Sequence, residues 1–215
     1  MIGKFQKQEN FLAHWQEFRD VLNQQKLMFF LDYDGTLTPI VDTPEQAILP
    51  KRTKEILKAL SENNQCRVAI ISGRALRDIK KLVGLKGIIY VGNHGLQIDA
   101  PGIVFPSPIS PRIKTIIRNI SSDLKKRLSG IKGISLEDKG ITLSIHYRLA
   151  TKASFIKMQS VFKETVSPYR VRGKIKINKG KKVFEIKPAV EWGKGHAVLW
   201  LLRKLRLRNR GKKIL

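Results

Sequence analysis

Residues 27–40 read LMFFLDYDGTLTPI, an apolar run that passes into acidic residues and glycine. The pattern predicts a strand over residues 26–32, buried on both faces and ending at the carboxyl edge of a parallel sheet. Asp32 and Asp34 therefore stand at a predicted strand tip. Because alternate side chains of a strand lie on the same face, their carboxylates are expected to point the same way.

Each residue of this segment has a chemical use at such a tip. Asp32 can attack a phosphorus atom and form an aspartyl-phosphate, while Asp34 can protonate the leaving oxygen and later activate water. Gly35 permits a tight turn that brings backbone amides toward a phosphate, and Thr36 offers a hydroxyl. Carboxylates facing a phosphate dianion need a cation, and the oxygen ligands of Asp32 and Asp34 indicate Mg²⁺. Taken alone, the motif also fits a calcium-type loop or a turn with incidental aspartates.

Strands and helices alternate on the C-terminal side of this segment. We expect a helix over residues 50–62, a strand over 67–71, a helix over 75–83 and a strand over 87–91. This order is typical of an α/β fold in which helices flank a parallel sheet. A further helix is predicted before the segment, over residues 11–24, from its apolar spacing.

The character of the chain changes after residue 95, where prolines crowd residues 101–111. The following elements are predicted to be helices over 113–128 and 153–165 and strands over 134–137, 141–147 and 171–178. Residues 183–186, Pro188 and the glycines on either side of Lys194 then lead into a helix over 196–205, which returns the chain to the first domain. We therefore expect a core formed by residues 1–103 and 188–215, with an α+β domain inserted over residues 104–187.

Two further polar residues stand at predicted element ends. Ser72 follows the second strand, where a hydroxyl and a helix N-terminus can bind an anion. Lys194 begins a later helix between two glycines and can stabilise a transferring phosphoryl group. Alone, Ser72 would more often be a helix cap and Lys194 a surface lysine. Their order after Asp32 and Asp34 nevertheless favours phosphoryl transfer.

The composition is strongly basic, with 42 Lys and Arg against 17 Asp and Glu and a net charge of +25. This charge attracts anions, either a nucleic acid or membrane surface or the substrate of a phosphate-binding enzyme. We favour the enzyme, because the basic residues are dispersed and no nucleic-acid-binding signature accompanies them. The single cysteine, Cys66, and the lack of a long apolar run predict a cytoplasmic protein without membrane association. We also expect a monomer.

Five stretches carry a resemblance to a known family: LDYDGTLTPI, AIISGR, VGNHGLQI, EDKGITLSIHYR and VFEIKPAVEWGKG, within residues 31–195. The chain resembles the trehalose-6-phosphate phosphatases of the haloacid dehalogenase superfamily. The resemblance implies a Rossmann-like core, an inserted α/β cap domain, Mg²⁺, and release of trehalose from its 6-phosphate.

The resemblance also implies residue roles. Asp32 would be the nucleophile and Asp34 the general acid and base. Ser72 and Lys194 would be the phosphate ligands, and we expect Thr36 and Gly73 to bind the phosphate beside them. The sugar-binding residues would be Arg74, Asn93, His94 and Gly95 from the core, and Glu137, Lys139 and Glu185 from the cap.

Other interpretations of these residues and of the activity stay open. His94 can be a structural histidine, the segment of Glu137 and Lys139 a solvated hairpin, and Glu185 a member of a surface ion pair. The activity can belong to a related phosphatase for sucrose phosphate or glucosylglycerol phosphate. The chain can also be a non-catalytic basic protein that binds anions or nucleic acid.

The chain departs from the family pattern in one respect. Family members carry a later acidic cluster, Gly-Asp-Asp-x-Thr-Asp-Glu, which completes the magnesium site, whereas no acidic residue follows Glu191 here. The strand that precedes this cluster pairs in the family with the strand bearing Asp32. We therefore expect the Asp32 strand to lie at a sheet edge, and this chain alone to turn over weakly or not at all.

Overall fold

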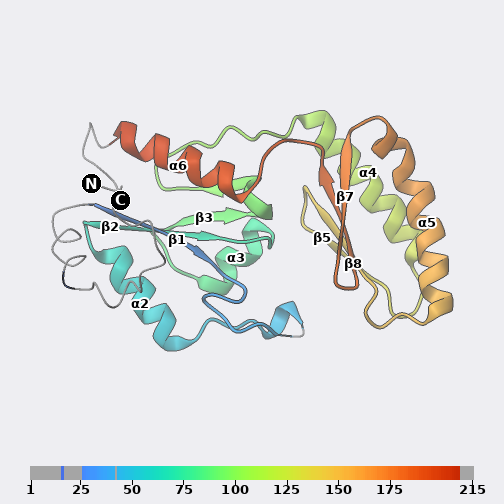
Figure 1. Cartoon of the computed structure of the whole chain (residues 1–215), viewed down its shortest axis with the longest axis horizontal. Helices are drawn as coiled ribbons and strands as arrows, with labels where there is room; N and C mark the ends of the chain where they lie inside the picture. Colours follow the sequence, from blue (N-terminus) through green and yellow to red (C-terminus); the bar gives the residue numbers. More distant parts are fainter. Residues whose placement is uncertain (1–15, 17–25, 42, 209–215) are drawn as a thin grey trace.

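The computed structural model describes residue 16 and residues 26–41 and 43–208. Residues 26–41 and 43–208 form two lobes side by side (Figure 1). The first lobe contains a mainly parallel sheet between helices, and the second an antiparallel sheet with two helices on its outer face. The predicted helix over residues 11–24 lies almost wholly outside the described residues. Within them, no helix has the length and apolar character needed to cross a bilayer.

The sheet of the first lobe has the order β1-β2-β3-β4. Its strands are β1 (Leu27–Asp32), β2 (Cys66–Ile71), β3 (Ile89–Gly92) and β4 (Gln97–Asp99). The first three run parallel, which confirms the predicted α/β fold, and β4 pairs antiparallel with β3. As described, β1 lies at the sheet edge. The short, partly polar β4 was not predicted because it lacks a strand pattern.

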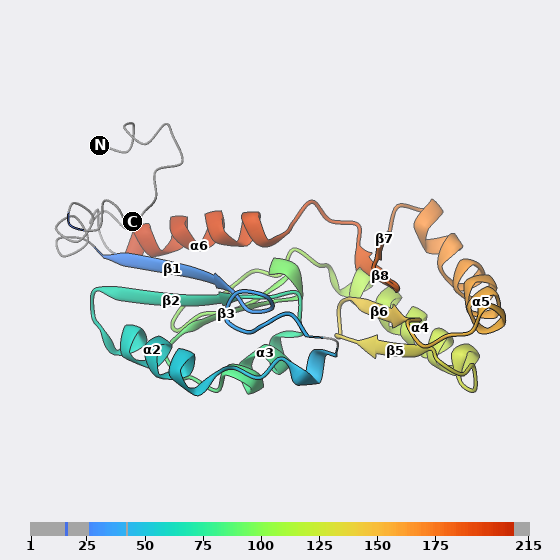
Figure 2. The same cartoon turned by 60° about the horizontal axis from the view of Figure 1, so that its bottom comes forward.

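Helices cover both faces of this sheet (Figure 2). On one face, α2 (Lys51–Glu62) and α3 (Leu76–Val83) pack with Ile70 and Tyr90. On the other, α6 (Lys194–Arg208) packs with the adjacent residues Ile71 and Val91. Consecutive strand residues thus bury into opposite layers. Because α6 packs on this sheet, its first residue, Lys194, lies near the carboxyl end of β1.

The second lobe contains a sheet of order β5-β6-β8-β7 whose neighbours are all antiparallel. Its elements are α4 (Pro111–Leu128), β5 (Ser135–Asp138), β6 (Leu143–His146), α5 (Lys152–Val171), β7 (Ile175–Gly180) and β8 (Val183–Pro188). Helices α4 and α5 cover one face with a shared apolar cluster that includes Leu124, Ile145 and Phe162. The other face is turned toward the first lobe (Figure 1).

Two predictions in this lobe are wrong. Helix α5 continues through Pro168 to Val171, past the predicted end at residue 165, so no strand begins at residue 171. Pro168 cannot donate a backbone hydrogen bond to the helix turn before it and normally ends a helix. Here Phe162 and Val166 are buried in the lobe's core, and this packing outweighs the local preference.

The chain crosses between the lobes twice, and the two crossings lie near one another (Figure 1). Phe105 of the first crossing contacts Trp192 of the second, with ring centroids 5.7 Å apart, and Trp200 of α6 at 5.0 Å. The Trp192 indole also donates a 2.7 Å hydrogen bond to the carbonyl of Gly95. The crossings are thus joined by aromatic packing, while the domain limits at residues 103/104 and 187/188 stay a prediction.

Candidate active site

The site lies at the carboxyl edge of the first sheet, where β1 ends at Asp32. Asp32 is paired in register with Ile71, and Ile71 with Val91, so the segments that follow these strands emerge side by side. The Lys194 ammonium at the start of α6 donates to Asp32 Oδ2 over 2.7 Å. The Asp32 carboxylate side chain remains 47% exposed. Packing of α6 thus brings together two residues that are far apart in the sequence.

Asp34 is held by an arginine from the neighbouring loop. Arg74 donates through Nε to Asp34 Oδ2 at 3.0 Å and through Nη2 to Oδ1 at 2.6 Å. Between the two aspartates, Tyr33 is fully buried and its hydroxyl donates to the carbonyl of Ala47. Successive side chains of an extended segment point to opposite sides. Because Tyr33 points into the core, the carboxylates of Asp32 and Asp34 lie at the surface.

The turn after Asp34 is tight. Gly35 has a φ of 81°, a left-handed conformation that glycine adopts without steric cost. Its N–H donates to the carbonyl of Thr38 over 2.9 Å, and the Thr38 N–H donates back to the carbonyl of Tyr33 over 3.1 Å. Thr36 is exposed at the tip of this turn. The geometry leaves the Thr36 hydroxyl open to a ligand at the sheet edge.

Ser72 and Gly73 follow β2. Ser72 is fully buried, and its Oγ accepts the backbone N–H of Arg74 over 3.0 Å. A ligand can reach this hydroxyl only after the loop rearranges. Gly73 lies against the ring of His94, where an added Cβ would come within 2.5 Å of His94 Cε1. A side chain at position 73 would therefore require the His94 ring to move away.

Residues 93–95 have three successive left-handed backbone conformations, with φ of 50° at Asn93, 57° at His94 and 100° at Gly95. Asn93 is fully buried, and both ends of its amide are hydrogen-bonded, so no free polar atom faces a sugar in this arrangement. His94 approaches the second lobe, with Nε2 3.6 Å from Glu185 Oε1. Gly95 presents its carbonyl to Trp192.

Charged groups from the second lobe face this edge. Glu137, Ser144 and Glu185 are register partners across β5, β6 and β8 and therefore share one face of the sheet. Glu137 Oε2 lies 3.1 Å from His146 Nε2 and 3.5 Å from Lys139 Nζ. Burial alone would raise the pKa of Glu137, but His146 and Lys139 together outweigh it and lower that pKa.

Glu185 is the most strongly perturbed group of this site. The His94 ring from the first lobe and the Lys187 ammonium, 2.7 Å from Oε2, lower the pKa of Glu185 to about 2, although burial opposes the shift. Glu185 thus remains a carboxylate at neutral pH between two basic side chains.

Sequence reasoning missed two residues of this arrangement, Thr142 and His146. Both lie on β6 or next to it, on the face shared with Ser144. In ITLSIHY, residues 141–147, polar residues alternate with apolar ones. This alternation predicts a strand with one polar face, and it could have identified Thr142 and His146 as neighbours of Ser144 on that face.

Comparisons with known proteins agree with this architecture. The profile of the family described as Trehalose-phosphatase matches residues 30–214. The probable trehalose-phosphate phosphatase D of Arabidopsis thaliana is 28% identical over 209 residues, covering 92% of this chain and 55% of that protein. The trehalose-phosphate phosphatase of Mycobacterium tuberculosis is 31% identical over 177 residues, covering 82% of this chain and 44% of that protein.

Among solved structures, the C-terminal domain of C. albicans trehalose-6-phosphate phosphatase superposes with a TM-score of 0.62 and 25% identity. That match covers 89% of this chain and 66% of the solved one. The chain spans about half the length of the curated relatives it matches. The family profile covers most of the sequence and the solved relative shares the fold, so the chain belongs to the trehalose-phosphatase family.

Proposed function

We propose that this chain hydrolyses trehalose 6-phosphate to trehalose and phosphate through an aspartyl-phosphate on Asp32, with the weak turnover expected when the later acidic cluster of the family is not present. The observation that carries the proposal is the contact of Asp32 with Lys194 at the carboxyl edge of the sheet, with Asp34 two residues further on. This set contains a nucleophile, a cation and a second carboxylate for proton transfer. The names of the related proteins support the substrate.

In the first step, an oxygen of Asp32 forms a bond to phosphorus while the bond from phosphorus to the sugar oxygen breaks. Asp34 gives a proton to that leaving oxygen. In the second step, Asp34 takes a proton from water as the water oxygen attacks the aspartyl-phosphate, which releases phosphate and restores Asp32. Lys194 offsets the charge of the transferring group in both steps.

The ion pairs of the site must exchange partners for this reaction. Lys194 is bound to Asp32 and Arg74 to Asp34, so both cations are occupied by carboxylates. Asp34 can carry a proton only after Arg74 releases it, and a phosphate dianion offers both cations an alternative anion. The exchange costs little free energy for Lys194, whose pair with Asp32 is exposed. It costs more for Arg74, whose side chain is only 16% exposed.

A magnesium ion fits the donor chemistry of Asp32 and Asp34. Both carboxylates are 47% exposed at the same sheet edge. Mg²⁺ commonly binds one or two protein carboxylates and completes its shell with water and phosphate oxygens. The described residues contain no cluster of three or more acidic, His or Cys ligands, so water and phosphate would supply the remaining ligands. When bound, the ion would offset phosphate charge.

Glu137, Lys139 and Glu185 are proposed to bind the sugar hydroxyls. Their support is a polar face of the second sheet that is turned toward the edge of the first sheet bearing Asp32, the catalytic edge of this proposal. On that face the carboxylates can accept hydrogen bonds from sugar hydroxyls and the ammonium can donate them. Charged groups of both signs suit a ligand that presents many hydroxyls.

The test is phosphate release by the purified chain in the presence of Mg²⁺. Trehalose 6-phosphate, sucrose 6-phosphate and glucose 6-phosphate are compared at equal concentration, with Asp32→Asn as the control for contaminating phosphatase. We expect the highest kcat/KM for trehalose 6-phosphate. Equal or faster hydrolysis of either other sugar phosphate would contradict the proposed specificity, and release that persists in Asp32→Asn would contradict the mechanism.

A further inference from the structure

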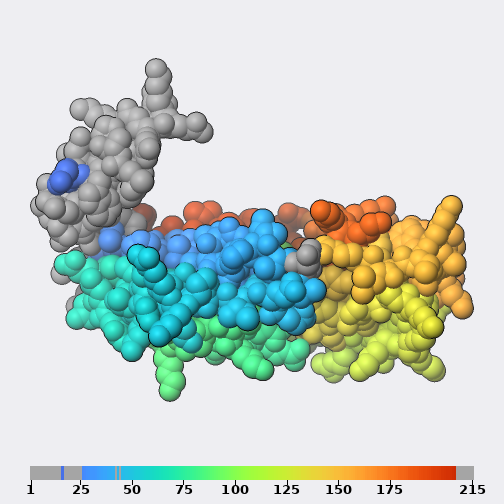
Figure 3. Space-filling view, turned by 90° about the horizontal axis from the view of Figure 1, so that it is seen from below, coloured from blue at the N-terminus to red at the C-terminus, as the bar shows by residue number. Residues whose placement is uncertain are grey.

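We propose that Asn93 and Thr142 are positioning residues: a buried hydrogen bond between them sets the place of the second lobe's β5–β6 turn over the catalytic edge. The kinetic part of this inference rests on the proposed function, whereas its structural part does not. The two residues belong to different lobes, Asn93 following β3 and Thr142 preceding β6. Figure 3 shows the surfaces of the two lobes meeting along a seam.

The contact is buried and short. Thr142 Oγ1 donates to Asn93 Oδ1 over 2.7 Å, and the two residues are 3% and 0% exposed. Asn93 Nδ2 donates to the carbonyl of Lys139 over 3.2 Å, a second bond between the lobes. Breaking such bonds without replacing them leaves buried polar atoms unpaired, which is costly.

The directions of these bonds are determined by the chemistry of the partners. The Lys139 carbonyl can only accept, so the amide nitrogen of Asn93 must face it. The second N–H of this nitrogen donates to Gln97 Oε1 of β4 at 2.5 Å. The Asn93 oxygen is then left to accept from Thr142, the one partner that brings a hydroxyl. Gln97 therefore helps to orient Asn93 toward the second lobe.

The backbone of Asn93 connects this contact to the loop of residues 72–74, which follows β2. Its N–H donates to the carbonyl of Arg74 over 2.7 Å, and the His94 N–H donates to the carbonyl of Ser72 over 3.1 Å. Asn93 keeps a φ of 50°, which asparagine tolerates better than most side chains. The residue thus joins the loop that holds Asp34 through Arg74 to the turn that holds Lys139.

Hydrogen bonds hold the β5–β6 turn, residues 138–142, in one shape. The Lys139 N–H donates to the carbonyl of Thr142 over 3.0 Å, and the Gly140 N–H donates to Asp138 Oδ1 over 2.7 Å. Asp138 Oδ2 accepts from Ser121 of α4 over 2.6 Å, which fixes the turn to its own lobe. Holding Thr142 therefore also holds the nearby groups proposed to bind sugar, Lys139 and Glu137.

The first variant is Thr142→Val, which keeps the shape of the side chain and removes the hydroxyl. Two readouts are measured: amide hydrogen exchange of residues 138–142, and KM and kcat for trehalose 6-phosphate. We expect faster exchange in this segment and a KM raised about 5- to 30-fold, the factor for one or two kcal/mol, with a smaller change in kcat. Thr142→Ser restores the hydroxyl and should restore both values to near those of the wild type.

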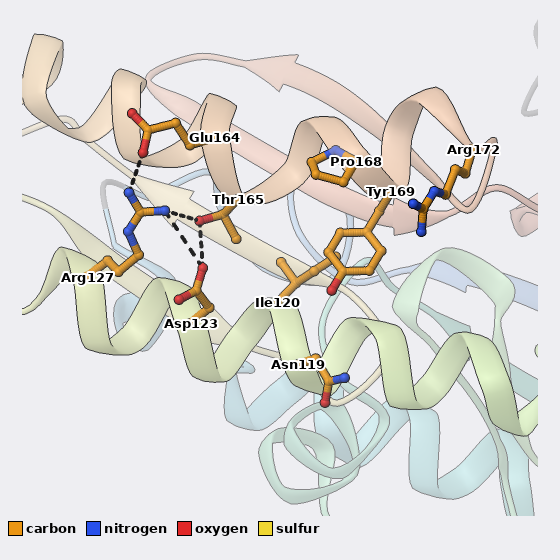
Figure 4. A pocket seen from close by; sticks show the side chains of 9 residues that line it. All are labelled: Asn119, Ile120, Asp123, Arg127, Glu164, Thr165, Pro168, Tyr169 and Arg172. Carbon is orange, nitrogen blue, oxygen red and sulfur yellow. Dashed lines mark hydrogen bonds and ion pairs between the residues drawn. The ribbon is translucent and has the colours of Figure 1, made fainter.

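The matched control is Thr165→Val, in the hollow between α4 and α5 shown in Figure 4. Thr165 is also buried, donates to Asp123 Oδ2 over 2.9 Å and accepts from Arg127 Nη1 over 3.1 Å, all within the second lobe. Its loss should destabilise that lobe without touching the contact between lobes. We therefore expect unchanged KM and unchanged exchange of residues 138–142 relative to the rest of the lobe.

A second variant, Asn93→Asp, keeps the oxygen that accepts from Thr142 and replaces both amide donors by an acceptor that faces the Lys139 carbonyl. It should raise KM and exchange at least as much as Thr142→Val. Wild-type exchange and KM in both Thr142→Val and Asn93→Asp would overturn the inference, as would equal effects from Thr165→Val. If the wild type fails to hydrolyse trehalose 6-phosphate, the proposed function fails, and the exchange measurement still decides the positioning role.

Discussion

The catalytic edge and the contact between the lobes differ in the kind of interaction that holds their side chains and in its exposure to water. At the catalytic edge, Asp32 forms an exposed ion pair with Lys194, and Asp34, itself exposed, pairs with the partly buried Arg74. At the interlobe contact, Asn93 and Thr142 form a buried hydrogen bond between neutral groups. Exposed pairs contribute about 0–1 kcal/mol and can exchange partners, whereas an unpaired buried polar group costs about 1–3 kcal/mol. The groups proposed to react can thus exchange partners, whereas the groups proposed to set the geometry cannot do so without leaving buried polar atoms unpaired.

Of all the variants, Asp32→Asn at the catalytic edge is expected to have the largest effect on kcat. The amide cannot form the phosphoenzyme, so kcat should fall about 10⁴-fold or more, as for other lost nucleophiles. Stability should change by about 1 kcal/mol or less, because only an exposed ion pair is removed. Phosphate release and thermal unfolding measured on the same sample separate the two. Large destabilisation would mean that the pair is structural.

Lys194→Met should lower kcat by about 10²- to 10³-fold, the usual cost of removing one group that stabilises charge in a transition state. Lys80→Met is the matched control, because Lys80 forms an exposed ion pair with Asp99 elsewhere on the first lobe. Steady-state kinetics of both variants provide the measurement. A similar loss of kcat in both would show that general surface charge, and not the position of Lys194, matters.

The pH dependence of stability tests the contacts of Glu185 with His94 of the first lobe and with Lys187. Its folded pKa of about 2 lies below the ordinary value of 4.5, so ionised Glu185 favours the folded state. This contribution is fully present above pH 4.5 and is lost as the pH falls toward 2. The stability difference between wild type and Glu185→Gln, measured by urea unfolding, should therefore shrink over this range. A constant difference from neutral pH to pH 3 would contradict the assignment.

The smallest effect is expected at the hydrogen bond from the Trp192 indole to the Gly95 carbonyl, near the two crossings between the lobes. Trp192→Phe removes the indole donor to the Gly95 carbonyl and keeps an aromatic ring beside Phe105. Because Trp192 is only partly buried, water can replace the donor, and the loss should be about 1 kcal/mol of unfolding free energy. Chemical denaturation is the measurement. A greater loss than that of Thr142→Val would reverse the ranking of the two contacts.

Much of the first lobe could be predicted because local patterns determine it. The apolar run before Asp32 and the alternation of strands and helices up to residue 92 are found where the sequence indicates. The end of α5 could not be predicted, since Pro168 is tolerated only through packing of the helix in its lobe. Local preference and tertiary packing disagree there, and packing prevails.

The site shows the same division. The carboxylates of Asp32 and Asp34 could be placed at the strand tip from spacing alone. The burial of Asn93 could not, because its partners Lys139 and Thr142 come more than 40 residues later, from the other lobe. Before folding, an Asn-His-Gly segment has the features of a polar loop. The proximity of the lobes makes it part of a buried hydrogen-bond network.

The central claim is that Asp32 carries the phosphoryl group. The most direct measurement is rapid acid quenching of the chain during turnover of trehalose 6-phosphate with Mg²⁺, followed by proteolysis and peptide mass spectrometry. We predict a phosphorylated peptide whose modified residue is Asp32, and none from Asp32→Asn under the same conditions. Phosphate on a different residue, or turnover without any phosphorylated peptide in samples quenched before the steady state, would contradict this account.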